Sequence, residues 1–534
     1  MDVRVFCALN RDGRVLFDVS TDQPATLSAA IRIRMSVGNS FAPETRTLGQ
    51  WMLPIVPLVG VTVACVAYAN GLPYPASACA AIAVTCAGWW IFESLHIAIV
   101  GLLPMAALPA LGVLDHERVA ASYGHTMIWL LMGGCFLSVA MERSNAHRRI
   151  ALGMVRAVGG RGGRRLVLGF MLATATLSMW ISNSATTLMM LPIAMAVLSQ
   201  TKDDSLRTPL LLAIAYSASV GGMATPIGTP PNLVFMGIIE EQFGIEVSFF
   251  RWMTFGVPVV IAMLPIIWWW LTRNLDDDGS VTMPEVGPWT SAERRVFVVF
   301  TLTALAWIFR SGPAGGWSSW FGLGDMVGDT TVALVATMAL FLMPAGCELP
   351  GSAEHATPKS VQPPVVSPTN SLRARRGTPR LLDWESARTI PWGILLMFGG
   401  GLALGSGFQQ TGLSEAIGSQ LDFLSGRPTW VVVGVVCVAM NFMTEITSST
   451  ATATLMMPIL GVLATAAEIP PEWLLMPATV SASCAFMLPV ATAPNVIVFG
   501  AGGLRTDEMA RNGLVLNMIA AVVILAVAKW TFGF

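Results

Sequence analysis

Charged residues are scarce in this chain of 534 residues, at 12% of the total, whereas a soluble domain has roughly 25%. Hydrophobic residues make up 54%. This balance excludes an ordinary soluble globular protein, and the net charge of −1 gives no sign of a basic surface for nucleic acid. We therefore expect an all-α polytopic membrane protein whose surroundings are the lipid bilayer, with no nucleic-acid partner.

Paired cysteines and catalytic clusters are missing as well. The eight cysteines are scattered, with no Cys-x-x-Cys pair, which favours apolar packing over disulfides or metal ligands. No His, Asp and Glu cluster and no nucleophile with a neighbouring base falls within an apolar segment. The sequence thus predicts a protein that is not an enzyme and that has no organic cofactor.

The first fifty residues contain six arginines and no continuous apolar core, which excludes a cleavable signal peptide. Two interpretations of this polar, irregular segment stay open. It is a disordered cytoplasmic tail, or it is an over-long translation start with Met35 or Met52 nearer to the true beginning.

Three motifs occur twice, in the same order and at a nearly constant spacing. The pairs are Leu-Leu-Met-Gly-Gly at 130–134 with Leu-Leu-Met-Phe-Gly at 395–399, Ser-Asn-Ser-Ala-Thr at 182–186 with Ser-Ser-Thr-Ala-Thr at 448–452, and Pro-Ile-Gly-Thr-Pro-Pro-Asn at 226–232 with Pro-Val-Ala-Thr-Ala-Pro-Asn at 489–495. The membrane part is therefore built twice. Apolar segments interrupted by Gly and Pro at corresponding places of two halves point to the binding site of a secondary transporter.

Eleven apolar segments approach the length of about 20 residues that a membrane-crossing helix needs. They are 51–69, 76–92, 94–113, 122–141, 210–238, 254–271, 296–309, 330–343, 391–411, 474–501 and 514–532. Two more, 166–198 and 430–464, carry the Ser-rich motif at their middles. As single helices they would be roughly 50 Å long, too long for a hydrocarbon core of about 30 Å, so we predict two re-entrant hairpins.

Basic residues predict the orientation, because Lys and Arg concentrate in cytoplasmic segments. Six arginines precede the first hairpin between 147 and 165, and the connection 345–390 is also basic. The approach to the second hairpin, 413–427, carries one arginine and two carboxylates. We expect a cytoplasmic N-terminus, an external C-terminus and two repeats that are inverted relative to each other.

The chain is accordingly divided into four parts. They are a polar tail (1–50), a first membrane half (51–344, with hairpin 165–200 and broken helix 210–238), a flexible cytoplasmic linker (345–388) and a second membrane half (389–534, with hairpin 428–466 and broken helix 473–503).

The interrupted segments supply ligands for small ions. Broken helix is tolerated in a membrane only where it faces protein or a watery cavity, and proline removes a backbone donor. Carbonyls with Ser, Thr and Asn oxygens suit sodium, whereas free amides at a helix start suit carboxylate oxygens. One tip packed against one break makes one cation site, the repeat makes a second, and an anion between them would touch both tips.

Glu445 is the only carboxylate inside the second hairpin's arm, and Met179 stands at its counterpart in the first half. A carboxylate at membrane depth is a functional candidate. A structural hydrogen bond and a role in proton or cation coupling both stay open.

At these motifs the sequence resembles the divalent anion:sodium symporter family, from about residue 50 to the C-terminus. The resemblance implies a homodimer, a scaffold and a transport domain in each protomer, an elevator motion, and sodium as the coupling ion. It assigns the first sodium site to Ser178, Ser182, Asn183 and Gly228, the second to Thr444, Ser448, Ser449 and Ala491, and a small dicarboxylate anion to Asn183, Ser184, Thr229, Ser449, Thr450 and Thr492.

Two residues depart from the family pattern, which has Asn at 449 and Thr at 184. The most specific expectation is sodium-driven uptake of a C4-dicarboxylate such as succinate, fumarate or malate. The alternatives are a sodium-independent dicarboxylate exchanger, a sodium-coupled citrate or sulfate transporter, and an anion channel.

Overall fold

The structure is a computed structural model that describes residues 4–9, 15–20, 48–158, 162–200, 204–275, 287–311, 315–324, 326–346, 379–420 and 426–534. The chain divides into two units, Met1–Thr47 and Leu48–Phe534. Most of the predicted linker, 347–378, lies outside the described residues, as do 421–425 ahead of the second hairpin.

The first unit contains an antiparallel pair of strands, β1 (Arg4–Leu9) and β2 (Val15–Ser20), with Arg4 opposite Ser20. This pair corrects the expectation of a wholly irregular tail. The signal in the sequence is an Asp-Gly pair at 12–13 between two segments rich in Val, Leu and Phe, a typical hairpin pattern. Residues 21–47 lie outside the described part of the chain.

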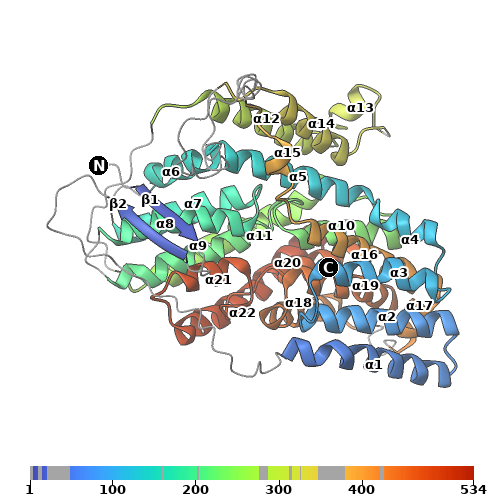
Figure 1. Ribbon diagram of the computed structural model, residues 1–534. Coiled ribbons are helices and arrows are strands. Elements are labelled where there is room, and N and C mark those ends of the chain that lie inside the picture. Colours follow the sequence, from blue (N-terminus) through green and yellow to red (C-terminus); the bar gives the residue numbers. More distant parts are fainter. Residues whose placement is uncertain are drawn as a thin grey trace, which may run out of the picture. The chain divides into compact units, whose positions relative to one another are not determined.

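The second unit is helical throughout its described residues, apart from an isolated bridge between Pro344 and Arg380 (Figure 1). Its first half comprises α1 (Leu48–Ala69), α2 (Tyr74–Ile91), α3 (Ile97–Ala110), α4 (His116–Tyr123), α5 (Thr126–Arg143), α6 (Ala146–Val158), α7 (Gly163–Ser178), α8 (Asn183–Leu198), the short η1 (Asp204–Leu206), α9 (Arg207–Gly221), α10 (Pro230–Phe243) and α11 (Phe249–Thr272). The helices α12 (Ser291–Ile308), α13 (Gly316–Trp320) and α14 (Asp329–Leu342) complete the first half, and α15 (Trp384–Ala387) lies in the predicted linker. The second half comprises α16 (Trp392–Gln410), α17 (Leu413–Ser419), α18 (Thr429–Ile446), α19 (Ser449–Ala466), α20 (Pro471–Ser481), α21 (Ala493–Gly500) and α22 (Thr506–Phe532).

Seven helical segments among the described residues are long and apolar enough to cross a membrane. They are Leu48–Ala69, Tyr74–Ile91, His116–Arg143, Phe249–Thr272, Thr429–Ile446, Ser449–Ala466 and Thr506–Phe532. Five of them coincide with spans among the eleven predicted from hydropathy, and the other two, Thr429–Ile446 and Ser449–Ala466, are the arms of the second predicted hairpin. Some predicted spans are missing from this set because the broken helices are split. The segment 210–238, for example, consists of α9 and α10, with 15 and 14 residues.

The helices repeat in the same order as the motifs. The run from α5 to α11 recurs as α16 to α22, so that α5 and α16 begin at 126 and 392, α8 and α19 at 183 and 449, and α10 and α21 at 230 and 493. The duplication read from three short motifs therefore extends over whole helices.

Local sequence explains why the paired segments break. Ser182 precedes α8, and its side chain accepts a hydrogen bond from the amide of Ala185, as a helix N-cap does. Pro230 and Pro494 lie in the first turn of α10 and α21, where proline is favoured because that turn needs no donor. Each interruption thus ends one helix and starts another.

Backbone hydrogen bonds join the two ends of the predicted linker, residues 343–345 and 379–381. The amide of Ala345 donates to the carbonyl of Pro379 at 2.6 Å, and that of Leu381 donates to the carbonyl of Met343 at 3.0 Å. The chain therefore leaves the end of α14 and returns beside it.

Candidate functional site

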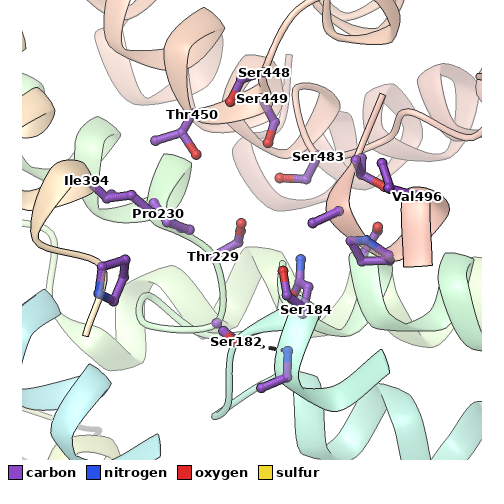
Figure 2. Close-up of a pocket in the computed structure, with 18 of the residues that line it drawn as sticks. Ser182, Ser184, Thr229, Pro230, Ile394, Ser448, Ser449, Thr450, Ser483 and Val496 are labelled. Atoms are coloured by element: carbon purple, nitrogen blue, oxygen red, sulfur yellow. Dashed lines mark hydrogen bonds between the residues drawn. The ribbon is translucent and has the colours of Figure 1, made fainter. Parts of the chain in front are cut away.

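Both hairpin tips and both helix breaks line one cavity of about 1090 Å³ (Figure 2). The tips contribute residues 182–185 and 446–450, and the breaks contribute 227–230 and 490–494. Segments from the two halves of the chain thus meet at a single site, and the rest of the wall comes mainly from α5 and from the start of α16.

Four helices begin at the wall of this cavity: α8, α10, α19 and α21. Their first amides have no partner within the helix, and each helix start carries a partial positive charge. The described wall contains no Lys or Arg, and its two carboxylates are Glu93 and Glu142. Hydroxyls, amides and helix starts are therefore the groups available to an anion here.

Ten of the twelve residues assigned from the sequence lie in the cavity wall. They are Ser182, Asn183, Ser184, Gly228, Thr229, Ser448, Ser449, Thr450, Ala491 and Thr492. The other two, Ser178 and Thr444, are fully buried behind the tips. The hydroxyl of Thr444 donates to the Asn441 carbonyl at 2.9 Å.

At the first tip several oxygens converge. The Ser178 hydroxyl lies 2.6 Å from Asn183 Oδ1 and 2.7 Å from the Ala218 carbonyl oxygen. A Cβ on Gly222 would lie 2.6 Å from Asn183 Oδ1 and 3.2 Å from the Gly228 carbonyl oxygen. Neutral hydroxyl, amide and carbonyl oxygens of this kind fit a hard cation such as sodium.

Gly222 was not found from the sequence, although Gly221 and Gly222 form a glycine pair just ahead of the break. A Cβ on Gly228 would lie 2.5 Å from the Gly222 carbonyl oxygen, so the backbones of Gly222 and Gly228 approach closely. Glycine permits such contacts. Any side chain at Gly222 would displace Asn183 or the Gly228 carbonyl.

The last residue of each break motif is an asparagine that braces the break. The Asn232 amide donates to the carbonyls of Gly222 at 3.0 Å and Thr225 at 2.8 Å. Asn495 does the same with the carbonyls of Ala485 and Leu488, both at 3.0 Å. The acceptors occupy corresponding positions of the two halves, so the same pair of hydrogen bonds holds both breaks.

Glu445, on the first arm of the second hairpin, holds the backbone of the second break by hydrogen bonds. Its carboxylate is 3% exposed and accepts hydrogen bonds from the amides of Met487 and Leu488, both at 2.9 Å, and from Asn517 Nδ2 at 2.6 Å. These three donors account for its burial, since a buried carboxylate must be hydrogen-bonded. In the first half, by contrast, the Thr225 hydroxyl donates to the Met179 carbonyl.

The wall also contains polar residues outside the repeated motifs: Ser138 and Glu142 of α5, Ser219 of α9 and Ser483 after α20. Sequence reasoning missed all four, although Ser219 and Ser483 each end a Ser-Ala-Ser sequence that occurs in both halves, at 217–219 and 481–483. That repeat is a signal that could have found these two residues.

Comparison with known proteins gives the family. Residues 48–533 match the family model described as the sodium:sulfate symporter transmembrane region. The chain belongs to this family of divalent anion:sodium symporters, and it is an integral membrane protein. The resemblance read from the paired motifs is thereby confirmed.

Relatives with assigned names share most of the chain. A sodium-dependent dicarboxylate transporter, SdcS, of Staphylococcus saprophyticus is 38% identical over 469 residues, which is 84% of each protein. The protein of the same name from Staphylococcus aureus is 35% identical over 481 residues, which is 86% of each. Both relatives are named as transporters, not as enzymes.

A solved structure shares the fold. The crystal structure of the Alcanivorax borkumensis YdaH transporter matches 82% of this chain and 99% of its own chain, with a TM-score of 0.53 and 15% identity. This match supports the all-α membrane architecture.

Replacing Asn495 by alanine is expected to destabilise the protein. The buried carbonyls of Ala485 and Leu488 would lose their side-chain donor, at about 1–3 kcal/mol. Asn232→Ala should cost a similar amount because the same pair of bonds is lost. Thermal unfolding in detergent measures the effect, with Asn70→Ala on the exposed end of α1 as the control. Melting temperatures that match the control would show that the asparagines do not brace the breaks.

Proposed function

We propose that this protein is a secondary active transporter that takes up C4-dicarboxylates such as succinate, fumarate or malate with sodium. The observation that carries the proposal is the single cavity walled by both hairpin tips and both helix breaks. Relatives named as sodium-dependent dicarboxylate transporters, at 35% and 38% identity, support the ion and the substrate class.

The first sodium ion binds between Ser178, Ser182, Asn183 and Gly228. The gathering of oxygens around Asn183 Oδ1 supports this site. The second sodium ion binds at Thr444, Ser448, Ser449 and Ala491. Support for this site comes from the repeat, since Ser178 and Thr444 occupy corresponding positions of the two halves and both are fully buried behind a tip.

The dicarboxylate lies between the two tips. The hydroxyls of Thr229, Ser449 and Thr450 point towards a common space in Figure 2. Ser184 and Thr492 lie in the same wall, and the starts of α8 and α19 add partial positive charge from the two sides. Asn183 serves both ligands, because its Oδ1 faces the cation site and its Nδ2 remains for a carboxylate.

Charge balance supports coupling to sodium. A dianion that enters against an inside-negative potential of 100 mV costs about 4.6 kcal/mol, from about 2.3 kcal/mol per charge. The described cavity wall holds no Lys or Arg to neutralise the substrate. Two sodium ions cancel the charge, and a third makes uptake electrogenic and driven by the potential.

The cavity has the form of an inward-facing state. Its wall continues to Leu48, Glu93 and the segment 389–391, which lie at helix ends that the positive-inside rule assigns to the cytoplasm. We infer that the hairpins and broken helices move as a transport domain against a scaffold in an elevator motion. The protein acts as a homodimer in a bacterial plasma membrane, with its N-terminus cytoplasmic and its C-terminus external.

Uptake into proteoliposomes tests the proposal. Labelled succinate should accumulate in response to an inward sodium gradient and should not accumulate when potassium replaces sodium. Fumarate and malate should compete with it better than citrate or sulfate. Counterflow that needs no sodium would indicate an exchanger, stronger inhibition by citrate or sulfate would indicate another anion, and large unitary currents would indicate a channel.

Asn183→Ala should raise the half-saturating sodium concentration and weaken succinate binding together. Each loss is expected to be roughly tenfold to a hundredfold, because a hydrogen bond to a charged group contributes about 1.5–3 kcal/mol. Ser199→Ala, at the far end of the same hairpin helix, serves as the control because its hydroxyl bonds the Ala196 carbonyl. An unchanged sodium dependence at normal abundance would remove Asn183 from the cation site.

Cysteine labelling tests the orientation. In a variant whose Cys7, Cys65, Cys135 and Cys347 are replaced by serine, so that the remaining described cysteines are buried, Ser419→Cys should react with an impermeant thiol reagent from outside. Gly163→Cys should react only after the reagent reaches the inside. Reaction of both cysteines from one face would contradict the inverted repeat.

A further inference from the structure

Ser483 has no role in the repeated motifs, yet it lies in the wall of the cavity just after α20. It is 4% exposed, and its hydroxyl has no hydrogen-bond partner among the described residues. Nearly all buried polar side chains have a partner, so an unpaired hydroxyl at a binding cavity indicates a group that a ligand satisfies.

The Ser483 hydroxyl is directed towards the second hairpin tip. Figure 2 shows its oxygen pointing into the space that the hydroxyls of Ser449 and Thr450 also face. Backbone bonds fix its position, because the Ser483 amide donates to the Val480 carbonyl at 3.0 Å in the turn that ends α20. Three hydroxyls from two separate segments therefore surround one space.

The broken helices of the two halves agree at this place, and the hairpin tips differ. Ser-Ala-Ser occurs at 217–219 and again at 481–483, so Ser219 is the counterpart of Ser483. Ser219 also lies in the cavity wall, is 2% exposed and has no hydrogen-bond partner among the described residues. At the tips, by contrast, Asn183 carries an amide and its counterpart Ser449 carries only a hydroxyl.

We propose that Ser483 is a substrate-binding residue whose hydroxyl donates a hydrogen bond to the carboxylate held at the second tip. Because Ser449 has no amide to donate, the hydroxyls of Ser449, Thr450 and Ser483 recognise one carboxylate group of the dicarboxylate. This assignment rests on the proposed dicarboxylate transport. It makes the second tip a hydroxyl-lined subsite, whereas the first tip uses the Asn183 amide.

Succinate affinity in Ser483→Ala tests the assignment. At saturating sodium the variant should bind succinate about tenfold or more weakly, since a donor to a charged group is lost. Its half-saturating sodium concentration at saturating succinate should stay as in the wild type. Ser483→Thr keeps the hydroxyl and should bind normally, and Thr479→Val serves as the control because that hydroxyl already bonds the Leu475 carbonyl.

A double-mutant cycle separates substrate binding from a merely structural role. Adding Ser449→Asn to Ser483→Ala restores an amide at the second tip and should recover most of the lost affinity, whereas independent sites would give additive effects. A Ser483→Ala variant that binds succinate within twofold of wild type would overturn the assignment. So would a shift in sodium dependence in place of succinate affinity, or a double variant that shows no recovery.

The wild-type measurement distinguishes this inference from the proposed function. If the wild type does not bind succinate in sodium, the proposed function fails at once. If it binds succinate and Ser483→Ala binds it equally well, the role of Ser483 fails and the proposed function stands.

Discussion

The structure depends on one constraint, which is that backbone amides and carbonyls inside a membrane need partners. Helices are interrupted between α7 and α8, α9 and α10, α18 and α19, and α20 and α21, and each interruption would leave such groups unpaired. The protein meets this requirement partly with its own side chains, as the amides of Asn232 and Asn495 show. The starts of four helices face one cavity, where we propose that ions and substrate take the place of protein partners.

Gene duplication accounts for the plan of the site but not for its details. The hydrogen bonds of Asn232 and Asn495 are the same in the two halves. The carboxylate of Glu445, by contrast, supports only the second break, and the corresponding residue of the first half is Met179. The hairpin tips differ as well, because Ser449 is shorter than Asn183. We therefore expect two ion sites of unequal affinity and an anion that is held differently at its two ends.

The sequence predicted much of this site because the spacing between repeats is nearly constant. That spacing separated the paired tips and breaks from the many Ser, Thr and Gly residues that only pack, and most of the assigned residues line the cavity. Reasoning from sequence did not place Gly222 or Ser483. The role of Gly222 depends on a close backbone approach, which leaves no pattern in the sequence. Ser483 belongs to a repeated Ser-Ala-Ser sequence, but the direction of its side chain follows only from the structure.

The boundaries of the fold were harder to predict than its centre. Hydropathy gave one span over 210–238, and the Gly-Thr-Pro-Pro-Asn motif predicted the break between α9 and α10, but the ends of these helices at Arg207 and Phe243 lie outside the predicted bounds. Reasoning from sequence also missed the strands β1 and β2, since the polar composition of the first fifty residues outweighed a short hairpin signal.

The central claim is that sodium and a dicarboxylate share the residues of one cavity. Titration calorimetry of succinate at low and high sodium tests it most directly, because linkage requires each ligand to strengthen the other by the same factor. The account predicts that succinate affinity rises at least tenfold with sodium, and a succinate affinity that is the same at both sodium concentrations would contradict it.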